Sequence, residues 1–323
     1  MSATTITVEE VFNAQAEPLG LEWVAARGAG GHEIESEMVQ KPSLALAGQL
    51  DFVYPNRLQV FGRAEISFLN KMASDERRGA LEGLFGKGLS ALMVSDRGRQ
   101  DLPPELTEVA EAHSTPLLLA RLPSPRLVHH LHHYLSRVLA ERTTVHGVFL
   151  DVMGLGTLLT GPSGVGKSEV ALELLTRGHH LIADDAPELA AEVPGMLVGR
   201  SPELLQDHME VRGLGILNIR HLFGPATIVA SKRLRLIIQF KRVQGDDLSQ
   251  IDRLQQEQDT QSILGIEIPR VVLPVTPGRN LAVMVEVAVQ SYFHKASGFN
   301  PEKDFRDRLR KRLQEDDRGG EWN

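Results

Sequence analysis

Residues 161–169 read GPSGVGKSE and lie between the apolar run TLLT and the helix-like run VALELL. Their fixed positions fit the pattern G-x-x-x-x-G-K-[ST] at Gly161, Gly166, Lys167 and Ser168. Glycines let successive backbone N–H groups turn inward around phosphate oxygens, and a following helix adds its positive N-terminal end. The stretch therefore predicts a phosphate-binding loop, called the phosphate loop below, made of Gly161, Pro162, Ser163, Gly164, Val165, Gly166, Lys167 and Ser168.

The phosphate loop has the sequence context that such a loop requires. Residues 158–160 predict a strand before it, and residues 168–177 predict an amphipathic helix after it. Lys167 can then reach the β- and γ-phosphates of a nucleotide, and the Ser168 hydroxyl can ligate Mg²⁺. The alternative is a Gly-rich turn between a strand and a helix, and the flanking elements favour the binding loop. ATP hydrolysis, switching, small-molecule phosphorylation and protein phosphorylation all use such a loop, so its presence alone leaves the function open.

Two acids end the next apolar run. The stretch LIADD places Asp184 and Asp185 at the carboxyl end of a predicted strand, where ligands gather in sheets of this kind. One aspartate could hold Mg²⁺, directly or through water, and the other could accept a proton from an attacking hydroxyl. A polar strand end or a helix N-cap, the latter supported by the following Pro187 and Glu188, is an equally weighted alternative.

Three later stretches carry further candidate residues. Residues 210–224, EVRGLGILNIRHLFG, combine an acid, two arginines and three glycines, which permit close backbone approach to a ligand. Arg253 (in IDRLQ) and Arg279 (in PVTPGRN) could clamp phosphoryl oxygens with their guanidinium groups. The alternatives are a turn between two core segments for the first stretch and an ordinary surface position for each arginine.

Composition limits the classes of protein that the chain can belong to. It has 42 acidic and 35 basic residues, a net charge of −7, which disfavours a general nucleic-acid surface. The absence of cysteine excludes disulfides, Cys-based zinc sites, iron–sulfur clusters and a thiol nucleophile. We expect a soluble cytoplasmic protein with no membrane contact, because the start MSATTITVEEVF is unlike a secretory signal and no apolar run approaches the roughly 18 residues that span a membrane.

The pattern along the chain predicts two α/β domains, residues 1–133 and 134–323. The first contains strand-like runs such as 58–61 and 89–95, then helix and strand patterns over 102–120 and a long helix that begins after the prolines near residue 123. The second holds the phosphate loop and ends in an amphipathic helix with Phe305, Leu309 and Leu313 on one stripe. Its many basic residues could dock an acidic protein, although a solvated face is the commoner meaning of such charge.

A histidine-rich run, HHLHHY at residues 129–134, is a candidate metal site. His129, His132 and His133 share one helical face, but no nearby acid or cysteine completes a ligand set. We therefore favour a solvated or junctional helix face.

Taken together, these stretches resemble bacterial HPr kinase/phosphorylase. The resemblance rests on HGVFLDVMGLGTLLTGPSGVGKSEVALELLTRGHHLIADD, on EVRGLGILNIRHLFG and on PVTPGRNLAVMVEVA, and it extends more loosely into the first domain through RLQVFGRAEISFL. It implies an N-terminal α/β domain plus a C-terminal P-loop kinase domain related to phosphoenolpyruvate carboxykinase, in a homohexamer. It also implies an enzyme that uses ATP and Mg²⁺ to phosphorylate a serine of the phosphocarrier protein HPr, and that removes the phosphoryl group with inorganic phosphate to give pyrophosphate.

The resemblance also assigns roles to single residues. By match of motif, the family's active-site positions fall on His146, Lys167, Asp185 and Arg253, and its Mg²⁺ positions on Ser168 and Glu210. Residues 209–218 match a loop associated with both reactions, and residues 274–279 match one associated with dephosphorylation. Without the resemblance, a strand-capping role near the domain junction is the favoured interpretation of His146.

Two departures from the family pattern stand out. The family usually has GDSGVGKS, where this chain has Pro162, so the start of the loop has one backbone N–H donor fewer. The stretch before Arg253 lacks an aromatic-rich run, and glutamine replaces the glycine expected after DRL.

Two other functions remain open at this point. A P-loop kinase or carboxykinase-like enzyme for a small metabolite would use Arg253 and Arg279 to hold an anionic substrate. A nucleotide-binding sensor would use the loop without turnover. Asp185 beside an intact Lys167–Ser168 pair argues against the sensor, because a sensor needs no base to activate a hydroxyl.

Overall fold

The computed structural model describes residues 5–96, 101–242, 259–276, 278–298, 304–306, 308–310 and 312. It divides into two compact units, Met1–Glu141 and Arg142–Asn323, called the first and second units below. The boundary expected at residue 133 falls inside helix α5 (Ser124–Val138). Leu127, Leu131 and Leu135 of α5 are fully buried in a core of the first unit, so the whole helix belongs to that unit.

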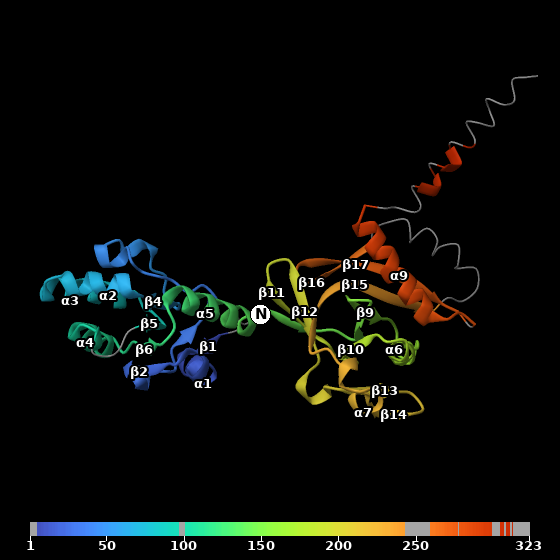
Figure 1. Ribbon diagram of the computed structural model, residues 1–323, viewed down its shortest axis with the longest axis horizontal. Coiled ribbons are helices and arrows are strands. Elements are labelled where there is room, and N and C mark those ends of the chain that lie inside the picture. Colours follow the sequence, from blue (N-terminus) through green and yellow to red (C-terminus); the bar gives the residue numbers. More distant parts are fainter. Residues whose placement is uncertain are drawn as a thin grey trace, which may run out of the picture. The chain divides into compact units, whose positions relative to one another are not determined.

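The first unit is a four-stranded sheet with helices on both faces (Figure 1). Its strand order is β2-β6-β5-β4, in which β4, β5 and β6 are parallel and β2 is antiparallel to β6. The bounds are β2 Glu22–Ala25, β4 Leu58–Phe61, β5 Ala91–Ser95 and β6 Leu117–Ala120. The strands expected at 58–61 and within 89–95 and 102–120 are thus confirmed.

Side chains that alternate along these strands build two cores. One face packs against α2 (Arg63–Lys71), α3 (Ser74–Phe85) and α4 (Pro104–Ala112), and the other packs against α1 (Val8–Leu19) and α5. Both faces of the parallel strands are covered, which explains why their residues are apolar apart from the buried Gln59 and Ser95. Smaller elements of this unit are β1 Ile6–Thr7, β3 Glu33–Ile34, η1 Arg27–Ala29, η2 Ala45–Ala47 and η3 Leu50–Phe52.

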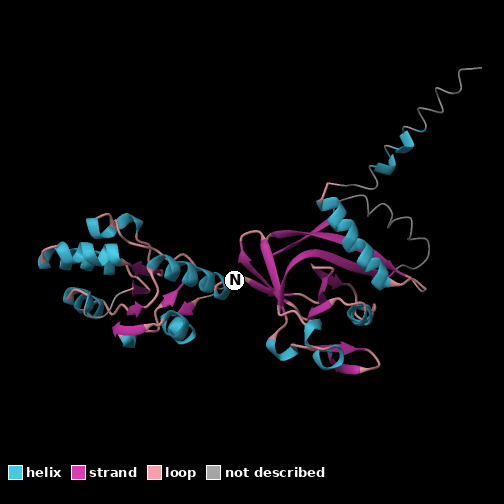
Figure 2. Cartoon of the chain, in the orientation of Figure 1, coloured by secondary structure: helices cyan, strands magenta, loops and turns pink. Residues whose placement is uncertain are grey.

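The second unit is built on a nine-stranded sheet. Its order is β10-β8-β9-β15-β12-β11-β7, and β17 pairs with both β15 and β16. Figure 2 shows the strands of this sheet in magenta. The bounds are β7 Arg142–Thr144, β8 Val148–Val152, β9 Leu155–Thr160, β10 His180–Ala183, β11 Glu188–Val193, β12 Met196–Arg200, β15 Ser231–Arg242, β16 Asp259–Ile263 and β17 Ile266–Val275.

Strand direction brings four strand ends to one edge of this sheet. Strand β8 is antiparallel to both β9 and β10, so β9 and β10 run the same way. Strand β15 is parallel to both β9 and β17. The segments that follow β9, β10, β15 and β17 therefore emerge at the same edge, called the site edge below.

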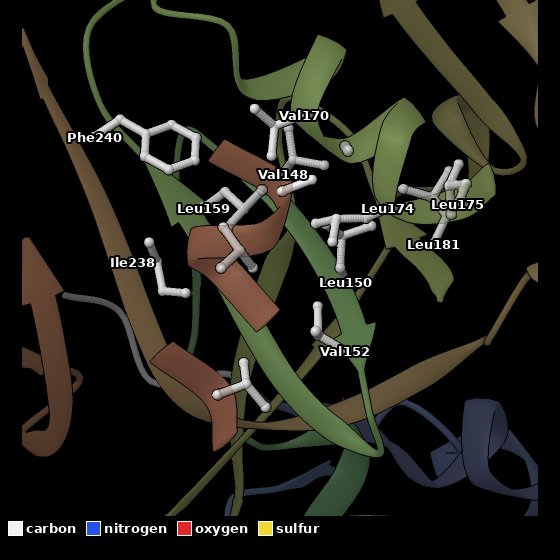
Figure 3. Packing of buried hydrophobic residues seen from close by; sticks show 14 of the residues in the cluster. Val148, Leu150, Val152, Leu159, Val170, Leu174, Leu175, Leu181, Ile238 and Phe240 are labelled. Atoms are coloured by element: carbon white, nitrogen blue, oxygen red, sulfur yellow. The ribbon is translucent and has the colours of Figure 1, made fainter. Parts of the chain in front are cut away.

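Helices α6 (Lys167–Thr176) and α9 (Leu281–Ala296) cover one face of the second sheet. Figure 3 shows Val170, Leu174 and Leu175 of α6 packed against strand residues such as Leu150. A separate hairpin, β13 (His208–Val211) and β14 (Gly215–Asn218), contributes Met209 to the same core. Shorter elements are η5 Glu203–Leu205, α7 Ile219–Phe223 and η6 Pro225–Thr227. Within the described ranges, no helix combines the length and apolar character needed to cross a membrane.

Candidate active site

The phosphate loop connects β9 to α6, as expected from the sequence. Gly161, Gly164 and Gly166 have φ values of +142°, +67° and +101°, a region that side chains disfavour. At Gly161 a Cβ atom would also lie 2.7 Å from the carbonyl oxygen of Phe240 on β15. The glycines of the motif are therefore required by backbone conformation and by close packing on the neighbouring strand.

Lys167 lies buried at the first position of α6 and folds back under the loop. Its Nζ donates to the carbonyl oxygens of Gly161, at 3.0 Å, and Pro162, at 3.3 Å. The Pro162 carbonyl also accepts the N–H of Val165 at 3.3 Å. Pro162 thus lacks a donor but supplies an acceptor that holds the loop closed around the lysine.

Asp184 links three parts of the second unit at the site edge. It follows β10 and is only 5% exposed. One carboxylate oxygen accepts the Ser168 hydroxyl at 3.5 Å, and the other accepts the backbone N–H of Glu210 at 2.9 Å. Burial raises the pKa of Asp184, the Glu210 N–H opposes that rise, and the charge of Asp185 adds to it. This carboxylate therefore holds α6 and the β13–β14 hairpin at the end of β10.

Asp185 points away from the protein interior. Its φ is +64°, a left-handed conformation that aspartate tolerates better than most residues. Its side chain is 67% exposed and pairs with Nδ1 of His146 at 2.9 Å, and its carbonyl accepts the N–H of Gly147 at 3.0 Å. The helix N-cap alternative is wrong, because residues 188–193 continue as strand β11.

His146 lies between β7 and β8 and is itself 59% exposed. Because its side chain pairs with an acid at the site edge, the strand-capping interpretation does not describe its surroundings. The structure thus brings together His146 and Asp185, which lie in separate stretches of the sequence.

Glu210 extends the site from β13. Its Cα is paired with that of Ile216 across the hairpin, and its neighbours Met209 and Val211 are buried. Side chains alternate along a strand, so Glu210 lies on the open face of the hairpin, beside Ile216, which is 75% exposed. The Glu210 side chain is therefore exposed, while its backbone N–H binds Asp184 and the other face of the hairpin joins the core.

The residues expected to hold Mg²⁺ offer only oxygen donors. These are the Ser168 hydroxyl and the Glu210 carboxylate, and the buried Asp184, which contacts both residues, adds a second carboxylate. Such a set suits a hard cation. Over the part of the chain that the structure describes, no three His, Asp or Glu side chains gather closely enough to hold a metal ion alone. The set fits an ion that completes its coordination with water and substrate phosphates, as Mg²⁺ does. The metal positions taken from the resemblance were Ser168 and Glu210, without Asp184, although the sequence pattern offered one of the two acids in LIADD for Mg²⁺.

The structure describes only one of the two candidate arginines. Arg253 lies outside the described residues. Arg279 follows β17 at the site edge, is exposed, and donates its N–H to Thr276 at 3.5 Å. The next residue, Asn280, caps α9 by accepting the N–H of Val283 at 2.9 Å, so this turn is anchored to a helix.

Two further arginines reach the phosphate loop. The Nη2 of Arg242, at the end of β15, donates to the Gly164 carbonyl at 2.6 Å. The Nη1 of Arg212, in the hairpin turn, lies 3.5 Å from the point where a Gly164 Cβ would be. Sequence reasoning did not select Arg242, because its only signal is its position at the end of a long apolar strand.

The histidine-rich run belongs to α5 in the first unit and makes structural contacts. His130 pairs with Gln15 at 2.7 Å, and His132 pairs with the Glu37 carbonyl at 2.9 Å. These contacts support the interpretation as a helix face and give no support to a metal site.

Comparisons with known proteins cover both units. The family of the HPr Serine kinase N terminus matches residues 6–135, and that of the HPr Serine kinase C-terminal domain matches residues 137–309. An HPr kinase/phosphorylase of Chromobacterium violaceum is 44% identical over 304 residues, which are 94% of this chain and 95% of the relative. One of Neisseria gonorrhoeae is 43% identical over 319 residues, or 98% of each chain.

A solved structure is also similar to part of the chain. It is described as the structure of the Hpr(Ser) kinase/phosphatase from Coxiella burnetii, with 31% identity and a TM-score of 0.43. The match covers 50% of this chain and 98% of that one. Relatives above 40% identity align over nearly the whole chain, and the models of both domain families match it. The chain belongs to the HPr kinase/phosphorylase family.

Proposed function

We propose that the protein is a bifunctional enzyme of carbon-metabolism control. It phosphorylates a serine of HPr, the phosphocarrier protein of the sugar phosphotransferase system, with ATP and Mg²⁺. It also removes the phosphoryl group with inorganic phosphate and releases pyrophosphate. The observation that carries this proposal is the His146–Asp185 pair at the edge of the sheet that also bears the phosphate loop. The curated relatives, which bear the name of this enzyme and align over nearly the whole chain, support it.

The surroundings of the two aspartates support a different role for each. Asp184 is buried and both of its oxygens have hydrogen-bond partners, so it suits a structural and metal-binding role. Asp185 is mostly exposed, so the hydroxyl of another protein can reach it. In the forward reaction, Asp185 accepts the serine proton as the seryl oxygen bonds to the γ-phosphorus and ADP departs. In the reverse reaction, an oxygen of inorganic phosphate bonds to that phosphorus, and Asp185 returns the proton to the departing seryl oxygen.

The other residues hold and orient the reacting groups. Lys167 and the loop N–H groups bind the phosphates of ATP or pyrophosphate, and Nδ1 of His146 orients the Asp185 carboxylate. Arg253 is proposed to neutralise charge on the transferring phosphoryl group. Ser168 and Glu210, together with Asp184, would hold Mg²⁺. When bound, Mg²⁺ supplies electrostatic stabilisation of the phosphate charge.

The proposal extends to domain roles, assembly and location. The second unit would be a P-loop kinase domain resembling phosphoenolpyruvate carboxykinase, within the expected catalytic domain 134–323. The expected domain 1–133 would serve regulation or assembly. We also propose a homohexamer in the cytoplasm, where ATP is available. Sedimentation or light scattering should then give six times the chain mass of 35.6 kDa.

One assay tests the reaction directly. The protein is incubated with γ-labelled ATP, Mg²⁺ and purified HPr, and then chased with unlabelled phosphate. We expect label on a serine of HPr, followed by its appearance in pyrophosphate. A reaction without HPr is the control. Absence of both labelled products at saturating ATP would disprove the proposal.

A further inference from the structure

Arg242 lies at the end of β15, beside the phosphate loop. It is the last residue of β15, and its Cα is in register with that of Val275 on β17. Side chains two residues apart lie on the same face of a strand. Arg242 therefore shares the face of Ile238 and Phe240, which pack in the core that α6 covers. Figure 3 shows Ile238 and Phe240 among the side chains of that core.

Its guanidinium group makes a direct bond to the loop. Nη2 of Arg242 donates to the Gly164 carbonyl at 2.6 Å, a short bond of the kind that a charged donor forms. Gly164 has a φ of +67°, so its peptide occupies a conformation that the glycine itself permits but does not enforce. A contact from outside the loop can therefore decide which way this peptide faces.

The peptide between Gly164 and Val165 links the Arg242 contact to the inside of the loop. The carbonyl of Gly164 and the N–H of Val165 belong to one planar trans peptide, so they point in opposite directions. A carbonyl held outward by Arg242 keeps the Val165 N–H inside the turn, where it donates to Pro162 at 3.3 Å. This inner bond is longer than a typical N–H···O bond, so a phosphate oxygen can replace it at low cost.

We infer that Arg242 is a positioning residue for phosphate binding, acting through the Gly164 peptide. The inference rests on the proposed use of the loop for nucleotide phosphates and adds a residue outside the loop motif. Pro162 removes one N–H from the start of the loop, which makes the orientation of the remaining donors more important. Arg242 fixes one of them and places its charge beside the loop. Its effect falls on the binding of ATP and pyrophosphate, because the Asp185–His146 pair lies on other segments.

The test compares nucleotide affinity in the full-length protein. For Arg242→Ala we expect about tenfold weaker binding of a non-hydrolysable ATP analogue and of pyrophosphate, the loss of one charged hydrogen bond. The KM for ATP rises in parallel, kcat stays within about twofold of wild type, and the unfolding midpoint is unchanged. Arg242→Lys recovers part of the affinity, since an ammonium group donates to a carbonyl with the same charge.

Lys241→Ala is the matched control. It removes the same charge from the adjacent position of β15, but Lys241 lies on the opposite face of the strand. We expect wild-type affinity for this variant. Unchanged binding in Arg242→Ala, or an equal loss in Lys241→Ala, overturns the inference. A wild-type protein that binds ATP but does not phosphorylate HPr disproves the proposed function alone, while the affinities of the variants still decide the role of Arg242.

Discussion

Asp184 and Asp185 are consecutive in the chain but have opposite surroundings. The first is buried against Ser168 and the backbone of Glu210, where the loss of solvent raises its pKa. The second turns outward in a left-handed backbone conformation and pairs with His146. The left-handed backbone of Asp185 thus turns its carboxylate outward, where an incoming hydroxyl can reach it. The Asp184 carboxylate stays inside and holds Ser168 and Glu210 in place.

This difference predicts a specific result for Asp185→Asn. Asparagine keeps the size of the side chain and tolerates the left-handed conformation, so the fold and ATP affinity should remain at wild-type level. Loss of the proton acceptor should reduce serine phosphorylation by about 10²–10⁴-fold. Single-turnover transfer from labelled ATP measures the rate, and equilibrium binding of an ATP analogue is the control. Transfer at the wild-type rate would show that Asp185 is not the base.

At the scale of elements, Glu286 connects α9 to α6. It lies on α9 and accepts hydrogen bonds from Arg177, just after α6, at 3.0 Å from Nε. His179 Nε2 lies 3.0 Å from the same carboxylate, and Met153 donates its N–H to Nδ1 of that histidine at 3.4 Å. The group therefore ties two helices and the β8–β9 turn together at the side of the core.

This cluster predicts how stability responds to acid. The Arg177 hydrogen bonds lower the pKa of Glu286, burial opposes this change, and the His179 bond adds to it. A carboxyl whose pKa is lower in the folded state stabilises the fold above its unfolded value, near 4.5, and loses this contribution as the pH falls through the folded value. Glu286→Gln should therefore lower the free energy of unfolding at neutral pH and make less difference below about pH 4. Urea titrations across this pH range measure the free energy of unfolding of both proteins. A difference between wild type and variant that does not change with pH would contradict the prediction.

At the scale of the whole molecule, each unit has its own cores. Two of the four buried clusters contain only residues of the first unit, and the other two contain only residues of the second. Apolar burial is the main favourable term in folding, so a unit with complete cores can fold alone.

We therefore expect residues 1–141 to unfold cooperatively as an isolated fragment. A fragment that ends at residue 133, the boundary expected from sequence, cuts α5 before the fully buried Leu135. Losing one buried leucine costs about 2–5 kcal/mol, so the shorter fragment should be less stable by at least this amount. Circular dichroism during urea titration measures the stability of both fragments. Equal stability of the two fragments, or no cooperative transition in the longer one, would contradict the division into units.

Much of the candidate site follows from short stretches of sequence. The glycine spacing, the lysine and the flanking apolar runs predict the loop between β9 and α6, because they depend on interactions between residues close in the chain. The acids after β10 were found in the same way, since a strand end is visible as the end of an apolar run. The boundary expected near residue 133 differs from the division after Glu141, because the periodicity of α5 shows a helix but not the core on which its leucines pack.

The sequence by itself determined the phosphate loop, its flanking strand and helix, two α/β domains and the resemblance to a family of protein kinases. Only the tertiary structure decided that Asp184 faces inward and Asp185 outward, and that Arg242 reaches Gly164. The bond from Glu210 to Asp184 spans 26 residues, and that from Arg242 to Gly164 spans 78. Contacts at such separations depend on strand order and direction, which bring the ends of β9, β10 and β15 to one edge. Local sequence patterns do not specify the order and direction of the strands, so only the folded sheet reveals these contacts.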